Sequence, residues 1–170
     1  MEQQVKQVPY GVADFATVMT QNLYYVDKTM FLPELEKQPR NLFFIRPRRF
    51  GKSIFLSMLY SYYDCSQKDR FQELFGNLWI GHHPTDLQGR YQVLFLDFSQ
   101  ITGKIDVLEE RFNAYMSINL DAFVRQYAQY YQAEKDEILS RTEYADKIEL
   151  LFKAAKAHGY ALYLIIDEYD

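Results

Sequence analysis

The sequence predicts an α/β fold: a three-layer α/β/α sandwich in which helices cover both faces of a mostly parallel sheet. Three short apolar runs have the length and composition of strands buried on both faces, namely 42–45, 93–99 and 162–166. Segments in which apolar residues follow helical spacing separate these runs, and this alternation is typical of parallel sheets.

The residues before the first run predict a helical lead-in over about 1–40. Pro9 and Gly11 open a turn, and DFATVMTQN over 14–22 predicts a short helix. A second helix is expected over 29–36, followed by a polar connector that contains Pro39.

The segments between the strands predict helices. IFLSMLYSYY over 54–63 has no helix breaker, and a further short helix is expected over 67–78 before a turn-rich segment. Apolar residues then keep helical spacing from 105 to 131, and another helix is expected over 143–157, which closes near Gly159.

Composition limits the classes of protein that fit. A chain of 170 residues suits a single domain, 1–170, with its core over 41–170. A net charge of −4 argues against a surface built for nucleic acid or anionic membranes. No apolar run approaches the roughly 20 residues that span a bilayer. The start MEQQVKQVPY lacks a signal-peptide pattern, and Cys65 alone forms no internal disulfide, so we expect a cytoplasmic protein.

The stretch FIRPRRFGKS over 44–53 ends like a phosphate-binding loop. Such a loop follows a strand and opens a helix, where backbone amides and the helix dipole bind an anion. In this interpretation Gly51 allows close backbone approach, the Lys52 ammonium reaches the β and γ phosphates, and the Ser53 hydroxyl ligates Mg²⁺. A solvated basic turn is the alternative for this tripeptide taken alone.

The loop departs from the general pattern, because Arg46 stands where the first glycine is expected and Pro47 removes one amide. The guanidinium groups of Arg48 and Arg49 can compensate by forked contacts with phosphate oxygens. Five basic residues and no acid occur within 40–52, which is unusual in an acidic chain unless an anion binds there.

An ATPase needs a second, acidic element in addition to a phosphate loop. In this sequence the third apolar run, 162–166, is followed by two carboxylates. Asp167 would hold the Mg²⁺ shell, and Glu168 would orient and deprotonate the attacking water. Solvated acids at an ordinary strand end are the alternative. The predicted site thus comprises a catalytic Glu168, the metal ligands Ser53 and Asp167, and phosphate contacts from Arg46, Arg48, Arg49, Phe50, Gly51, Lys52 and Ser53.

Five motifs in order resemble the bacterial family of AAA-ATPase-like proteins, over about 8–170: YYVDKT, FIRPRRFGKS, ELFGNLWI, VLFLDFS and LIIDEYD. In that family the phosphate loop carries arginine at its entrance. The resemblance implies a P-loop NTPase fold, Walker A and Walker B motifs, and Mg-dependent binding and hydrolysis of ATP. Members typically continue into further ATPase elements and often a PD-(D/E)XK nuclease-like domain. The resemblance therefore implies an N-terminal fragment truncated after the Walker B strand, with turnover expected in the full-length protein and nucleic-acid contacts through domains absent from this chain.

Smaller features carry open alternatives. The segment 25–28 either lies near the nucleotide base or starts a helix that Asp27 caps. Asp97, at the end of the second strand, either assists a metal or caps the next segment. His82 and His83 are adjacent in a turn, so we expect no zinc site.

Two rival functions remain open at this stage. One is a nucleotide-binding switch or scaffold without turnover. The other is a nucleic-acid-binding module, in which the arginines hold a phosphate backbone and binding falls steeply with salt. A sheet that ends at the acidic strand also leaves an edge through which a homo-oligomer could form.

Overall fold

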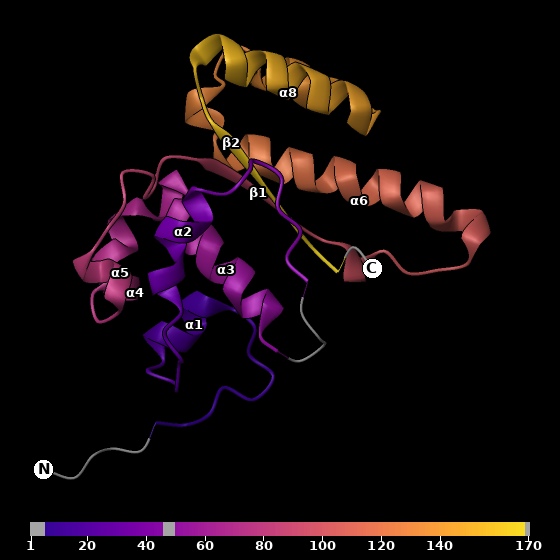
Figure 1. The fold of residues 1–170 in the computed structure, drawn as a ribbon. Helices are drawn as coiled ribbons and strands as arrows, with labels where there is room; N and C mark the ends of the chain where they lie inside the picture. The colour runs from indigo at the N-terminus through magenta and orange to yellow at the C-terminus, as the bar shows by residue number, and fades with distance from the viewer. Residues whose placement is uncertain (1–5, 46–49, 169–170) are drawn as a thin grey trace, which may run out of the picture. The chain divides into compact units, whose positions relative to one another are not determined.

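The computed structural model describes residues 6–45 and 50–168. The chain divides into two compact units, Met1–Arg90 and Tyr91–Asp170. Figure 1 shows the first unit from indigo to magenta and the second from rose to yellow.

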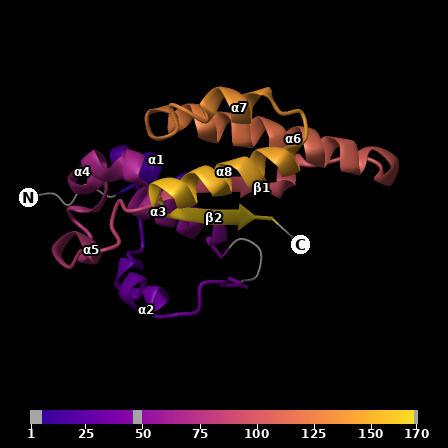
Figure 2. The same ribbon diagram turned by 90° about the horizontal axis from the view of Figure 1, so that it is seen from above.

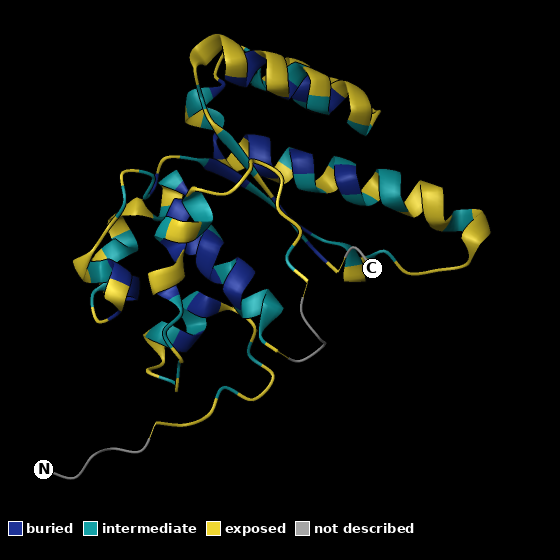
Figure 3. Ribbon diagram, in the orientation of Figure 1, coloured by how far each residue is buried: buried dark blue, intermediate teal, exposed yellow. Residues whose placement is uncertain are grey.

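Within its described residues, the first unit is helical. Its elements are α1 (Phe15–Thr20), η1 (Thr29–Phe31), α2 (Leu32–Glu36), α3 (Lys52–Tyr63), η2 (Cys65–Arg70), α4 (Phe71–Phe75) and α5 (Trp79–His82). The longest of these, α3, buries much of its surface, as the dark blue and teal segments of Figure 3 show. The core around it includes side chains with no exposed surface: Phe15, Val18, Leu32, Met58, Tyr62, Leu74 and Phe75.

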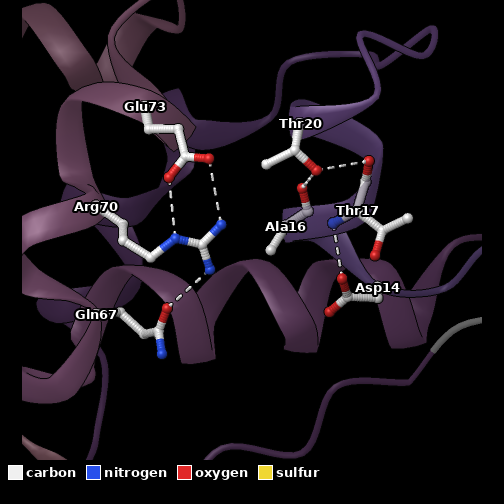
Figure 4. Close-up of polar contacts among 7 residues, drawn as sticks. All are labelled: Asp14, Ala16, Thr17, Thr20, Gln67, Arg70 and Glu73. Carbon is white, nitrogen blue, oxygen red and sulfur yellow. Dashed lines mark hydrogen bonds and ion pairs between the residues drawn. The ribbon is translucent and has the colours of Figure 1, made fainter.

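Polar contacts fix α1 against α3. The backbone amide of Phe15 donates to Ser57 Oγ at 2.9 Å, and Ser57 Oγ donates to Asp14 Oδ1 at 3.2 Å. Asp14 also caps α1, because its Oδ2 accepts from the amide of Thr17 at 2.7 Å (Figure 4). These bonds join the start of one helix to the middle of the other.

The second unit contains a pair of strands and the longest helix. Its elements are β1 (Gln92–Asp97), η3 (Phe98–Gln100), α6 (Ile105–Gln126), η4 (Ala128–Tyr130), α7 (Lys135–Ser140), α8 (Tyr144–His158) and β2 (Leu162–Asp167). The strands pair in parallel from Gln92 opposite Leu162 to Asp97 opposite Asp167. Figure 2 shows β2 with its arrowhead toward the C-terminus.

Helices α6 and α8 pack against each other, and buried residues lie mainly in the C-terminal half of α6 (Figure 3). Tyrosine hydroxyls connect this helical layer to β1. Tyr127 Oη accepts from the amide of Val93 at 3.1 Å, and Tyr115 Oη accepts from the amide of Asp97 at 2.7 Å. Tyr131 donates to the side chain of Gln92. These hydroxyls satisfy β1 amides at residues 93 and 97, which the parallel ladder leaves on the side away from β2.

The structure confirms the second and third predicted strands and their parallel pairing, and it places helices close to the predicted ranges. The prediction of a strand over 42–45 is wrong: this segment forms no strand in the structure, and Phe43 and Ile45 are 80% and 84% exposed. A strand needs hydrogen-bonded neighbours, and the described part of the first unit contains no other strand. The three-layer sandwich and the single domain over 1–170 stay predictions.

Among the described residues, no helix combines the length and apolar character needed to cross a membrane.

Candidate functional site

Helix α3 begins at the predicted phosphate loop. Gly51 occupies the N-cap position with φ 74° and ψ 32°, in the left-handed region. A Cβ at this position would lie 3.4 Å from Ile54 Cγ2, an ordinary contact, so the backbone angle and not the available space favours glycine. The Gly51 carbonyl accepts the first helical bond, from the amide of Phe55 at 3.2 Å.

The start of α3 differs from that of α1 in how it is capped. No hydrogen bond from a side chain caps α3 in the part of the chain that the structure describes, and its first turn contains no acid. The first amides of any helix lack intrahelical acceptors, and the helix dipole places partial positive charge there. Combined with a lysine at the first helical position, this end of α3 favours an anion.

The loop residues can be placed in part. Lys52 is the first and Ser53 the second residue of α3, and both are half-buried. Phe50 is 64% exposed and precedes the glycine. The structure therefore brings Gly51, Lys52 and Ser53 together in one helical turn. Arg46, Arg48 and Arg49 lie outside the described residues.

The acidic residues of the third strand sit where β2 ends. Asp167 is its last residue and is only 4% exposed. Its Oδ1 accepts from the amide of Glu168 at 2.9 Å. Glu168 has a positive φ of 51° and is exposed, so the backbone turns immediately after the strand. A buried carboxylate followed by an exposed one is compatible with different chemical roles for the two groups.

Asp97 ends β1 and is the register partner of Asp167. In-register residues of parallel neighbours point to the same face of a sheet, so both carboxylates project on one face. Asp97 Oδ1 accepts from the amide of Ser99 at 3.0 Å, which confirms the capping interpretation of this residue. The pKa of Tyr115 is raised above its ordinary value, because burial outweighs the opposing effect of the hydrogen bond that its hydroxyl accepts from the Asp97 amide.

A carboxylate pair of this kind offers hard oxygen ligands, which Mg²⁺ prefers. No group of three or more His, Cys, Asp or Glu side chains within the described ranges is arranged to hold a metal ion by itself. A metal there would therefore need oxygens from elsewhere, such as the phosphates and waters that usually complete a Mg²⁺ shell.

Two of the sequence motifs meet in the first unit, which sequence reasoning missed. Asp27 Oδ1 accepts from the amide and the hydroxyl of Thr29, at 2.8 and 2.7 Å. Asp27 Oδ2 accepts from the amide of Trp79 at 2.7 Å, and Thr29 Oγ1 accepts from the amide of Ile80 at 3.1 Å. The bond to the Thr29 amide, at the first residue of η1, agrees with the alternative in which Asp27 caps the helix that follows it. The bonds to the first amides of α5, which begins inside ELFGNLWI, were not predicted.

Comparison with known proteins gives a family match. A family model described as "Predicted AAA-ATPase" (AAA-ATPase-like) matches residues 9–170. A curated relative, "Uncharacterized protein in vnfD 5'region" from Azotobacter chroococcum mcd 1, is 31% identical over 167 residues, which make up 97% of this chain. The chain spans 29% of the length of that relative. No solved structure matches the chain significantly.

Proposed function

We propose that this chain, which belongs to the AAA-ATPase-like family of predicted ATPases, binds ATP together with Mg²⁺ and supplies residues for its hydrolysis. One observation carries the proposal: Gly51, Lys52 and Ser53 form the start of α3, a twelve-residue helix with a left-handed glycine at its N-cap and no acid in its first turn. This is the arrangement through which helix N-termini bind phosphate.

Each residue of the loop has a proposed role. The backbone amides at the start of α3 would bind phosphate oxygens, and the Lys52 ammonium would neutralise the β and γ phosphates. The Ser53 hydroxyl would ligate Mg²⁺. Arg46, Arg48 and Arg49 would add forked guanidinium contacts, replacing those that a glycine-rich entrance provides.

The acidic residues would perform the chemistry. Asp167 would orient water in the Mg²⁺ shell, and its burial favours a fixed carboxylate. Glu168 would accept a proton from the attacking water, which requires an accessible carboxylate such as this exposed one. The bond between the attacked γ phosphorus and the bridging oxygen would break, so that ADP and phosphate leave.

Calorimetric titration with ATP, with and without Mg²⁺, tests binding. We expect saturable Mg-dependent binding that Lys52→Ala abolishes and that Lys156→Ala, an exposed lysine of α8, leaves unchanged. Binding that needs no Mg²⁺ and falls steeply with salt would contradict the proposal and favour a nucleic-acid module.

Phosphate release tests turnover separately. Glu168→Gln should keep ATP affinity and lose turnover, because the amide cannot accept the proton from water. Equal turnover in the variant and the parent would remove Glu168 from its proposed role. Firm ATP binding without phosphate release by the parent would instead identify a nucleotide-binding switch.

A further inference from the structure

A cavity of about 300 Å³ lies in the first unit, and Phe55, the fourth residue of α3, is part of its lining. We name it the aromatic pocket. Its lining consists of Lys28, Phe31, Glu34, Leu35, Gln38, Phe44 and Phe55, and the Glu34 carboxylate is paired with Lys37. Most of this lining is apolar, and the volume lies at the lower end of the range for small-molecule pockets, so it suits one ring system better than a whole nucleotide.

The pocket offers aromatic faces on which a flat ligand can stack. Phe44 and Phe55 stack on each other with centroids 4.9 Å apart and planes at 19°. Phe31 is 57% exposed, although an aromatic ring of this size is usually covered in a folded protein. A planar heterocycle in the pocket could stack on the exposed ring of Phe31 and contact the stacked rings of Phe44 and Phe55.

Both ends of the wall that runs from residue 28 to residue 38 are held in place. At its start, Asp27 and Thr29 bond to the amides of α5. Near its end, Glu36 Oε1 accepts from the hydroxyl of Tyr63 at 3.1 Å, which ties α2 to α3. Thr85 Oγ1 donates to the same oxygen at 2.7 Å. The pocket is therefore preformed, which lowers the entropic cost of filling it.

Its position relative to the phosphate loop points to the ligand. Phe55 lies three residues after Lys52, about 4.5 Å along the helix axis. Side chains on a helix lean toward its N-terminus, so the ring of Phe55 covers the turn in which Lys52 lies. A ligand that contacts this turn through phosphates and enters the pocket through a flat ring is a nucleoside phosphate.

We propose that the aromatic pocket binds the base of the nucleotide whose phosphates occupy the start of α3. The inference rests on the proposed function and extends it to the part of the ligand that the phosphate loop does not contact. Phe31 stacks on the base, and the stacked rings of Phe44 and Phe55 form the apolar floor. Gln38, whose Nε2 donates to the carbonyl of Glu34, keeps its Oε1 as an acceptor for an exocyclic amino group.

Calorimetry with two ligands separates the base from the phosphates: ATP and inorganic tripolyphosphate, each with Mg²⁺. Phe31→Ala should weaken ATP binding about tenfold, as expected for loss of one stacking contact on a base. It should leave tripolyphosphate affinity unchanged. Met30→Ala is the matched control, because Met30 is the neighbouring exposed apolar residue and does not line the pocket. Phe31→Trp should retain ATP affinity, since indole also stacks.

The outcomes distinguish this inference from the proposed function. If Lys52→Ala abolishes ATP binding while Phe31→Ala binds ATP like the parent, the base pocket is wrong and the phosphate site stands. If Phe31→Ala weakens both ligands equally, the residue acts on the fold or the phosphates and the inference is again wrong. If the parent chain binds no ATP, the proposed function fails and the base pocket fails with it.

Discussion

Asp97 and Asp167 are register partners at the carboxyl ends of two parallel strands. Each carboxylate accepts a hydrogen bond from a backbone amide that follows it, from Ser99 for Asp97 and from Glu168 for Asp167. Ligands of α/β proteins gather at the carboxyl ends of parallel strands, and both carboxylates lie at that end of this sheet.

Conservative substitutions separate the two carboxylates. Asp167→Asn should weaken the affinity for Mg²⁺ in the presence of ATP ten- to a hundredfold, the usual effect of losing a group that orients metal ligands. Asp97→Asn should leave it unchanged, because an asparagine oxygen can still accept from the Ser99 amide. Titration of Mg²⁺ at fixed ATP measures both. An equal loss in the Asp97 variant would assign both carboxylates to the metal.

Asp27 should contribute strongly to stability, because its carboxylate accepts three hydrogen bonds, two from Thr29 and one from Trp79. Asp27→Ala leaves these donors without their acceptor and should lower the free energy of unfolding by about 2 kcal/mol. Urea unfolding followed by circular dichroism measures the change. Asp69→Ala, at an exposed aspartate of η2, is the control and should change stability by less than about 0.5 kcal/mol. Similar losses in both variants would contradict the capping role.

Those contacts also explain how far the sequence could predict this fold. The strands at 93–99 and 162–166 were predictable because solid apolar runs bounded by turns and helices have few alternatives. The run at 42–45 looks the same locally, yet strand formation depends on partners that a single sequence does not identify. The Asp27 contact with Trp79 spans 52 residues and has no local pattern.

The helix start at the phosphate loop was predictable to a similar degree. Gly51, Lys52 and Ser53 form a local motif whose helix context the sequence itself supplies, and the structure places all three at the start of α3. Their role in binding phosphate and Mg²⁺ stays a prediction. The aromatic pocket was not predictable, because Phe31 and Phe55 are ordinary apolar positions in their own helices. Phe31 ends η1 and Phe55 lies in α3, so the tertiary fold brings them to one cavity.

Asp14 should make stability depend on pH. Burial raises the pKa of Asp14. Hydrogen bonds from Thr17 and Ser57 and the charge of Arg70 together lower it by more, so the pKa lies below its ordinary value of 3.8. In Figure 4 the Arg70 guanidinium bonds to Glu73 and Gln67. A lowered carboxyl pKa stabilises the fold above the ordinary value, and this contribution is lost as the pH falls through the folded value.

Asp14→Asn isolates that charge, because asparagine also caps helices. The parent should be more stable than the variant near neutral pH, and the difference should shrink as the pH falls below 3.8 and through the lower pKa of the folded state. Urea unfolding at several pH values measures this. A difference that does not shrink at any pH below 3.8 would show that the charge of Asp14 does not contribute.

Lys147 and Asp121 form an ion pair that joins α8 to α6, with the lysine side chain 3% and the aspartate side chain 25% exposed. Asp121→Ala leaves a buried ammonium without its partner and should cost about 3 kcal/mol of unfolding free energy. Adding Lys147→Met to that variant removes the buried charge and should recover most of the loss. Thermal and urea unfolding of the two single variants and the double variant complete the cycle. A double variant no more stable than Asp121→Ala alone would mean that lost packing, and not the unpaired charge, destabilises the second unit.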